Sequence, residues 1–357
     1  MPSPVAIFGP SEISGFSRDF RVGEVAWATF RVAWARPCDS FLPWSLGRGT
    51  VVGMDRGQVT RVPSSPALAR VVELGWAQAA SPPSGARWER VVPTGKLHLV
   101  VRDGAPLRLA TGGASLGAAI VGGPRQTSYD KDVSAPSSSV GVVLGLGVTR
   151  ALFGVPASAL AEQHVSLEDL VGASEVARLR ERVLSPLEPA ARLAALEAWL
   201  EARVAASHET LVDVRVARGL ARLASCPTAT VSTMAAASGL GVRAFGRRFA
   251  ASVGLSPRAY GRVVRLGRVV AQLARTGPGS DAVLALEAGY ADQAHLCRDL
   301  RVFLGMTPSE YRASRARHPN HVPLRDVRPI RSSHASTHEA CSASAGAVHA
   351  LPRERER

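Results

Sequence analysis

Hydrophobic positions change their period near residue 160, and this change predicts two domains of different classes. Between about residues 67 and 155, short apolar runs are separated by Gly, Pro, Ser and Asp, which is typical of a β-rich domain. These runs lie at residues 71–72, 97–101, 119–121 and 140–146. Farther along, Leu193, Leu196, Leu200 and Val204 are spaced three or four residues apart, and this spacing predicts an amphipathic helix.

An internal repeat with an offset of 51 residues is the most specific pattern in the chain. In each copy, two apolar residues four apart share a helix face, a Gly ends that helix, and Ser-Pro or Thr-Pro begins the next. Thr307 and Glu310 also have the spacing of a capping box. The first copy contains Phe245, Phe249, residues 254–257 and Tyr260, and the second contains Leu296, Leu300, residues 305–308 and Tyr311.

Small residues precede each copy and predict a tight crossing of two helices. Ala235 is followed by Gly239, and Ala285 is followed by Gly289, with three residues between the members of each pair. Each copy therefore predicts a helix, a tight turn and a second helix. We expect an all-α domain with two such helix-turn-helix units over residues 206–316.

The charge of the chain favours a polyanionic partner. Its formal net charge is +14 and its isoelectric point is near 11.0. Residues 206–316 hold 15 arginines against 7 acidic residues, a net charge of +8. Arg suits guanine edges and Gln suits adenine edges, so the polar face of each predicted second helix fits DNA. On the helix predicted from residue 257 to about 273, Arg258 and Arg262 are expected at phosphates.

The segment from residue 231 to 311 resembles the DNA-binding domain of AraC/XylS-type transcription regulators. The resemblance rests on GYADQAHLCRDL from Gly289 and GMTPSEY from Gly305. It implies two recognition helices that enter successive major-groove segments. The implied base contacts are Arg243, Gly246 and Arg247 in the first helix and Gln293, His295 and Arg298 in the second. Further phosphate contacts are expected at Arg248 and Arg301.

The preceding region resembles the N-terminal domain of one subgroup of the same family. The motifs are RVVPTGKLHLVV from Arg90, IVGGPRQ from Ile120 and SVGVVLGLG from Ser139. Such domains look like small β-barrels, some of which sense effectors. The expected fold class is therefore α+β multidomain: a β-rich, barrel-like N-terminal domain and an all-α C-terminal domain. The expected divisions are 1–65 (an uncertain extension), 66–205 (β-rich regulatory or oligomerisation domain), 206–316 (DNA-binding domain) and 317–357 (a disordered tail).

The resemblance implies promoter DNA and RNA polymerase as partners, and leaves a small-molecule effector, a homodimer and the choice between activation and repression open. No membrane partner, cofactor or metal is predicted. The histidines and cysteine at His334, His338 and Cys341 lie in the expected disordered tail, which offers no scaffold for a metal site. The N-terminus lacks the layout of a secretion signal, so we expect a cytoplasmic protein.

Two other functions compete with the regulator. Bacterial methyl-transfer DNA-repair enzymes share this type of DNA-binding domain, but they need a reactive Pro-Cys-His-Arg element, whereas Pro37-Cys38 is followed by Asp39-Ser40. A helical adaptor or oligomerisation protein is the second alternative, because the apolar stripe from Leu193 to Val204 suits a partner as well as its own domain. We expect a regulator without catalytic activity, and specific DNA binding separates it from the adaptor.

Overall fold

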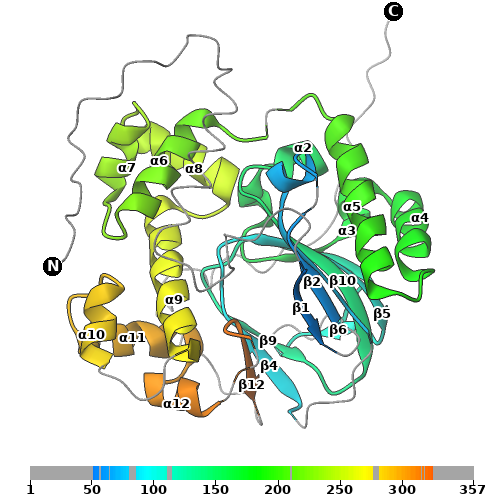
Figure 1. Cartoon of the computed structure of the whole chain (residues 1–357). Coiled ribbons are helices and arrows are strands. Elements are labelled where there is room, and N and C mark those ends of the chain that lie inside the picture. Colours follow the sequence, from blue (N-terminus) through cyan, green and yellow to red (C-terminus); the bar gives the residue numbers. More distant parts are fainter. Residues whose placement is uncertain are drawn as a thin grey trace, which may run out of the picture.

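A computed structural model describes residues 51–55, 58–63, 65–79, 86–110, 115–209, 211–275, 281–314, 316 and 318–324. Most of the expected N-terminal extension, and the residues His334, His338 and Cys341, lie outside this described part. A β-rich domain is followed by a helical domain (Figure 1), which confirms the expected fold class. No helix in the described part is both long and apolar enough to span a membrane.

Antiparallel pairing joins the strands into sheets. The strands are β1 (Val51–Asp55), β2 (Gln58–Arg61), β3 (Val72–Gln78), β4 (Trp88–Val91), β5 (Leu97–Gly104), β6 (Leu107–Arg108), β7 (Ser115–Leu116), β8 (Ala119–Gly122), β9 (Tyr129–Asp132), β10 (Ser137–Leu144), β11 (His164–Ser166) and β12 (His321–Leu324). The largest sheet has the order β1-β2-β3-β10-β5-β8-β11, a second has the order β12-β4-β9, and β6 pairs with β7. The apolar runs noted in the sequence thus overlap β3, β5, β8 and β10.

The predicted amphipathic helix is confirmed and covers one face of the large sheet. Leu193 packs so closely against Gly75 of β3 that a Cβ atom on Gly75 would lie 2.8 Å from the leucine Cδ1. Leu196 and Leu200 are also fully buried. The apolar stripe from Leu193 to Val204, which could have bound a partner in an adaptor, therefore packs against the protein's own sheet. The helices of this domain are η1 (Leu68–Arg70), α2 (Thr149–Phe153), η2 (Ala157–Leu160), α3 (Leu167–Val171), α4 (Ala173–Leu184) and α5 (Pro189–Ala205).

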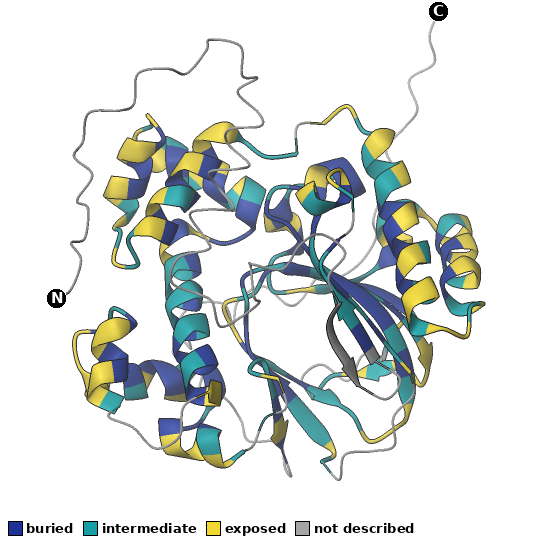
Figure 2. Cartoon of the chain, viewed as in Figure 1, coloured by how far each residue is buried: buried dark blue, intermediate teal, exposed yellow. Residues whose placement is uncertain are grey.

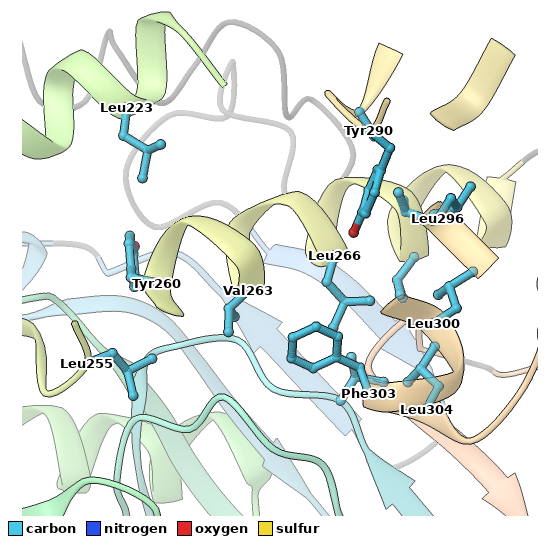
Figure 3. Packing of buried hydrophobic residues seen from close by; sticks show 14 of the residues in the cluster. Leu223, Leu255, Tyr260, Val263, Leu266, Tyr290, Leu296, Leu300, Phe303 and Leu304 are labelled. Carbon is cyan, nitrogen blue, oxygen red and sulfur yellow. The ribbon is translucent and has the colours of Figure 1, made fainter. Parts of the chain in front are cut away.

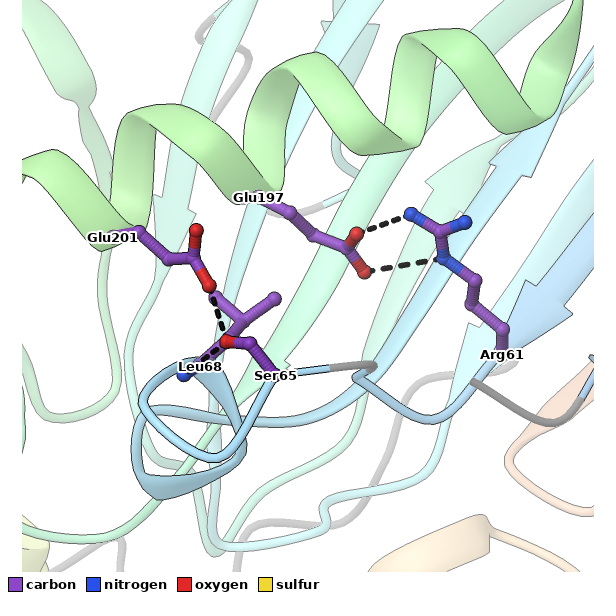
Figure 4. Close-up of polar contacts among 5 residues, drawn as sticks. All are labelled: Arg61, Ser65, Leu68, Glu197 and Glu201. Atoms are coloured by element: carbon purple, nitrogen blue, oxygen red, sulfur yellow. Dashed lines mark hydrogen bonds and ion pairs between the residues drawn. The ribbon is translucent and has the colours of Figure 1, made fainter. Parts of the chain in front are cut away.

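The β-rich domain begins earlier than residue 66, so the expected boundary is corrected. β1 pairs with β2, and β2 pairs with β3 inside the large sheet. Side chains then fasten this segment to α5: Arg61 forms an ion pair with Glu197, and Ser65 donates a hydrogen bond to Glu201 (Figure 4). The strands β1 and β2 are short, so their residues show little periodic pattern of apolar positions. Contacts with residues far away in the sequence hold them in place.

The helical domain has two three-helix groups joined by one long helix. Its helices are α6 (Val214–Ser225), α7 (Val231–Ala237), α8 (Val242–Val253), α9 (Pro257–Arg275), α10 (Asp281–Glu287), α11 (Gln293–Leu304) and α12 (Pro308–Ala313). Along α9, Tyr260, Val263 and Leu266 are buried and pack into the core that both groups share (Figure 3). Buried residues line the inner faces of these helices, and exposed residues lie outside (Figure 2).

A strand after the helical domain corrects the expected disordered tail from residue 317. β12 pairs in antiparallel register with β4 of the β-rich domain. Val322 and Leu324 point into the core of the helical domain, while His321 lies on the opposite face of the strand and contacts Glu89. The Tyr311 hydroxyl donates to the Pro319 carbonyl over 2.8 Å. This four-residue strand contains a proline and gains its stability from a distant partner, so its local pattern is weak.

Candidate DNA-binding surface

The turns and caps predicted for the repeat are confirmed. Gly239 and Gly289 have φ angles of 64° and 82°, which permit the sharp turns before α8 and α11. Ser256 accepts a hydrogen bond from the Ala259 N–H group over 3.2 Å at the start of α9. Thr307 and Glu310 form the capping box of α12. Both second helices of the repeat, α8 and α11, are therefore bounded by the residues that the sequence indicated.

The first candidate recognition helix, α8, exposes its basic face. Arg243 and Arg247 are exposed and make no ion pair with other described residues, while Phe245 and Phe249 are fully buried on the opposite side. A Cβ atom on Gly246 would meet open space, so the packing of the protein does not require glycine there. Exposed cationic side chains on a helix that is anchored by two aromatic rings suit a polyanionic groove.

Arg248 is also exposed on α8 and forms an ion pair with Asp213. Its Nη1 atom lies 3.0 Å from Asp213 Oδ2, and 53% of its side chain is accessible. Asp213 in turn caps α6 by accepting from the Arg215 N–H group. Because this pair lies at the surface, it contributes little to folding stability. Arg248 remains available for a phosphate.

The second candidate recognition helix, α11, presents the expected residues in two different environments. Gln293, Arg298 and Arg301 are exposed. His295 is half-buried, because its ring lies edge-on to Tyr290 with 5.1 Å between the ring centroids. Asp292 caps the helix by accepting from the His295 N–H group over 2.6 Å. These contacts fix the first turn of α11 firmly.

The two arginines expected at phosphates on α9 differ in their surroundings. Arg258 is exposed near the N-terminus of the helix. Arg262 is half-buried: its Nη2 atom donates to Asp299 of α11 over 3.0 Å, and its guanidinium lies 5.0 Å from the Phe303 ring centroid. Arg262 therefore contacts other residues of the protein, whereas the sequence predicted that it lies on a solvent-exposed face of the helix.

The two larger sheets also carry a second group of polar side chains that contact one another. We call this group the inner polar cluster. His164 lies edge-on to Tyr129, with 4.6 Å between the ring centroids, and Glu89 contacts both Lys131 and His321. Its members are Trp76, Glu89, His98, Tyr129, Lys131, His164 and His321.

Electrostatics in the inner polar cluster favour the neutral forms of His98 and His164. Burial, followed by the charges of neighbouring groups such as Lys96 and Lys131, lowers the pKa of His98 to about 3. Burial and the charge of Arg125 lower the pKa of His164 to about 4. Burial raises the pKa of Glu89, but the contacts with His321 and Lys131 outweigh it and hold this pKa below its ordinary value. Such histidines can accept or donate hydrogen bonds without carrying charge.

Arg90 is a further residue whose role the sequence analysis did not identify. It is fully buried and donates to both carboxylate oxygens of Asp130 on the neighbouring strand. In a strand where apolar and polar residues alternate, a basic residue is expected to be exposed to solvent. The acidic partner on β9 is the only sequence signal, and it lies in a different strand. Among the described residues there is no cluster of three or more potential metal ligands.

Two family descriptions match the chain. Residues 208–314 match a family described as a helix-turn-helix domain, and residues 60–166 match a domain of unknown function, DUF6597. No curated protein matches the chain significantly. The first match covers both α8 and α11, and the second covers most of the large sheet.

Several solved structures are similar to parts of the chain. A transcriptional regulator with an AraC-type DNA-binding domain from Chromobacterium violaceum is 25% identical, with 29% of this chain and 93% of that chain covered and a TM-score of 0.27. ToxT from Vibrio cholerae is 10% identical, with 72% and 98% covered and a TM-score of 0.38. ToxT with a bound unsaturated fatty acid is 10% identical, with 72% and 96% covered and a TM-score of 0.37.

Proposed function

We propose that the chain is a DNA-binding transcription regulator of the AraC type, and that α8 and α11 of its helix-turn-helix domain, residues 208–314, read successive major-groove segments of one promoter site. The proposed base contacts are Arg243, Gly246 and Arg247 from α8 and Gln293, His295 and Arg298 from α11. Arg248, Arg258 and Arg301 are proposed at phosphates. The proposed mechanism is DNA binding and recruitment of other proteins, without a catalytic step. Because the proposed partner is promoter DNA, the proposed site of action is the cytoplasm.

One observation carries this proposal: Arg247 and Arg298 occupy equivalent positions of the repeat and both are exposed. They are 51 residues apart, which is the offset of the repeat. Each lies on the outer face of a helix whose inner face is buried in the shared core. Bidentate contact with guanine is the commonest specific contact of arginine in the major groove. Two equivalent arginines on two helices therefore fit two half-sites.

Selection of DNA from a random pool by the full chain, near 150 mM salt, tests the proposal. We expect a motif of two parts whose centres are about 10 base pairs apart, because that distance is one turn of the double helix. The double variant Arg247→Ala/Arg298→Ala should lose the motif. Arg178→Ala/Arg182→Ala removes the same charge from the exposed face of α4 and serves as the matched control.

Binding that shows no sequence preference and disappears at moderate salt would contradict the proposal. Only the phosphate contribution would then remain, and that contribution falls steeply with salt. A polyanion-binding adaptor would become the better account. Equal losses of DNA affinity in the α8/α11 double variant and in the α4 control would also contradict the proposal. Both variants remove two positive charges, so charge alone would then explain the loss.

We further propose that the β-rich domain regulates the helical domain and that the inner polar cluster is where a small-molecule effector acts. The support is chemical: His164 of the large sheet lies edge-on to Tyr129 of the second sheet. Trp76 lies beside His98 in the large sheet, and β12 joins the second sheet to the helical core. An effector changes DNA affinity only if it binds one domain arrangement more tightly than another. RNA polymerase and a second copy of the chain are the proposed protein partners.

A further inference from the structure

Arg90 connects the β-rich domain directly to the end of the second recognition helix. Its Nε and Nη2 atoms donate to the two carboxylate oxygens of Asp130 over 2.7 and 2.8 Å, and its Nη1 atom donates to the Leu304 carbonyl over 2.6 Å. Leu304 is the last residue of α11. The side chain of Arg90 is 0% exposed, so the connection is shielded from water.

The contact uses groups that the end of a helix leaves unpaired. The last four carbonyl groups of a helix have no partner within the helix, and the negative end of the helix dipole lies there. Arg90 satisfies one of these carbonyls, and the Ser128 hydroxyl donates to a second one at Phe303. A Cβ atom on Gly305 would lie 2.6 Å from Arg90 Nη1, so the chain passes tightly over the guanidinium.

The first recognition helix also ends on the β-rich domain. The Gly147 N–H group donates to the Ser252 carbonyl over 3.1 Å in the last turn of α8. A Cβ atom on Gly254, just after this helix, would lie 2.2 Å from Pro124 Cγ. The C-terminal ends of both recognition helices therefore contact the β-rich domain. The joining helix α9 packs into the same core as both recognition helices.

We propose that Arg90 is a positioning residue for DNA recognition, which fixes α11 relative to α8 and thereby sets the spacing of the two half-sites that the protein reads. This inference rests on the proposed function. Because one base pair advances the duplex by about 3.4 Å, a small shift of α11 changes the preferred spacing. Asp130 holds the guanidinium in place, and Leu304 receives the hydrogen bond that locates the helix.

The variant Arg90→Lys isolates this role. Lysine keeps the positive charge beside Asp130, so the buried carboxylate stays compensated. It lacks the planar fork that bonds both carboxylate oxygens and a separate carbonyl at once. A single ammonium nitrogen cannot make all three contacts at once, so the fixed geometry between Asp130 and the Leu304 carbonyl is lost, while the charge balance of the interface remains.

The experiment measures the affinity of the full chain for a series of DNA duplexes near 150 mM salt. Each duplex carries the two half-sites selected by the wild-type protein, at the selected spacing or with one base pair added or removed. We expect the wild type to lose about 10-fold or more in affinity for a changed spacing, the size of one mismatched position. Arg90→Lys should show a difference below about 3-fold across the series, with the base preference of the first half-site unchanged.

Arg61→Lys is the matched control, because Arg61 forms an equivalent two-contact ion pair with Glu197 on α5, away from both recognition helices (Figure 4). It should keep the wild-type spacing preference. If Arg90→Lys keeps that preference and binds every duplex equally more weakly, Arg90 has only a structural role and the inference is wrong.

Asp130→Asn provides a second test if Arg90→Lys does not fold. The amide keeps the size of the side chain but offers the Arg90 guanidinium one acceptor oxygen in place of two. We expect a smaller flattening of the spacing preference, and an unchanged preference in this variant would overturn the inference. A wild-type protein that selects no two-part motif would instead contradict the proposed function, so the two failures are distinguishable.

Discussion

Arg262 of the linker helix and Asp299 of the second recognition helix form a half-buried ion pair with 3.0 Å between Nη2 and Oδ1. The side chain of Asp299 is 10% exposed and that of Arg262 is 32% exposed. The pair therefore ties α9 to α11. It also changes the expectation for Arg262, because a guanidinium engaged by a carboxylate and an aromatic ring is less available to a phosphate.

Arg262→Ala should destabilise the protein and leave the salt dependence of DNA binding unchanged. The buried carboxylate of Asp299 loses its cationic partner, and such a loss costs about 1–3 kcal/mol. Chemical denaturation measures the free energy of unfolding, and affinity measured at several salt concentrations gives the salt dependence. A stable variant with a reduced salt slope would show that Arg262 contacts a phosphate instead.

Arg258→Ala should give the opposite result. This side chain is exposed near the N-terminus of α9, so its removal should change the free energy of unfolding by no more than about 0.5 kcal/mol. The loss of one phosphate contact should reduce the slope of log affinity against log salt by about 1. An unchanged slope would remove Arg258 from the proposed phosphate contacts.

Arg298→Ala should relax the base preference at one position of the second half-site. Arg298 is exposed on α11, and a bidentate contact with guanine contributes about 1–3 kcal/mol of discrimination. Competition between duplexes that differ at single positions measures this discrimination. Arg301→Ala is the paired control: we expect it to weaken binding uniformly across sequences. A uniform loss for Arg298→Ala as well would mean that Arg298 contacts only the backbone.

Gly246→Ala should raise folding stability and lower DNA affinity. An alanine Cβ at this position meets open space, and alanine stabilises a helix interior by about 1 kcal/mol relative to glycine. The added methyl group would stand between Arg243 and Arg247 on the face proposed to enter the groove. We expect about a 10-fold loss of affinity, similar to one lost base contact. Denaturation and duplex titration measure the two effects.

Gly261→Ala is the matched control for the glycine variant. Its Cβ atom would lie 4.0 Å from Leu223 Cδ1, an ordinary van der Waals contact, within the long helix α9. It should stabilise the protein by a similar amount without changing the base preference of the first half-site. If Gly246→Ala also leaves DNA binding unchanged, the proposed contact at Gly246 is wrong.

Local signals account for the parts of the structure that the sequence predicted. Gly254, Thr307 and Glu310 act on their own chain neighbours, so the ends of the helices follow from short motifs. The pair of Arg90 and Asp130 joins two strands through the fold, and no local pattern distinguishes it from solvated charge. The same reason explains why β12 and the contact of Arg262 emerge only in three dimensions.

Acidification should destabilise the protein between about pH 6.5 and pH 4.5 through its neutral buried histidines. Burial, followed by the charge of Arg125, lowers the pKa of His164 to about 4, whereas an unfolded histidine has a pKa near 6.5. The unfolded state therefore binds a proton that the folded state rejects, so stability is full above pH 6.5 and falls as the pH decreases. Glu89, whose pKa lies below its ordinary value, adds a loss only below about pH 4.5.

The variant His164→Gln tests this dependence, because glutamine keeps hydrogen-bonding groups and does not titrate. Each such histidine contributes up to about 1.4 kcal/mol per pH unit within this window. Denaturation midpoints at pH 7.5 and pH 5 should therefore differ less in the variant than in the wild type, with His98 accounting for part of the remaining difference. His208→Gln alters an exposed histidine outside both sheets and should leave the wild-type difference in place. The same difference in His164→Gln as in the wild type would show that His164 is not held neutral by its burial beside Tyr129 and Arg125.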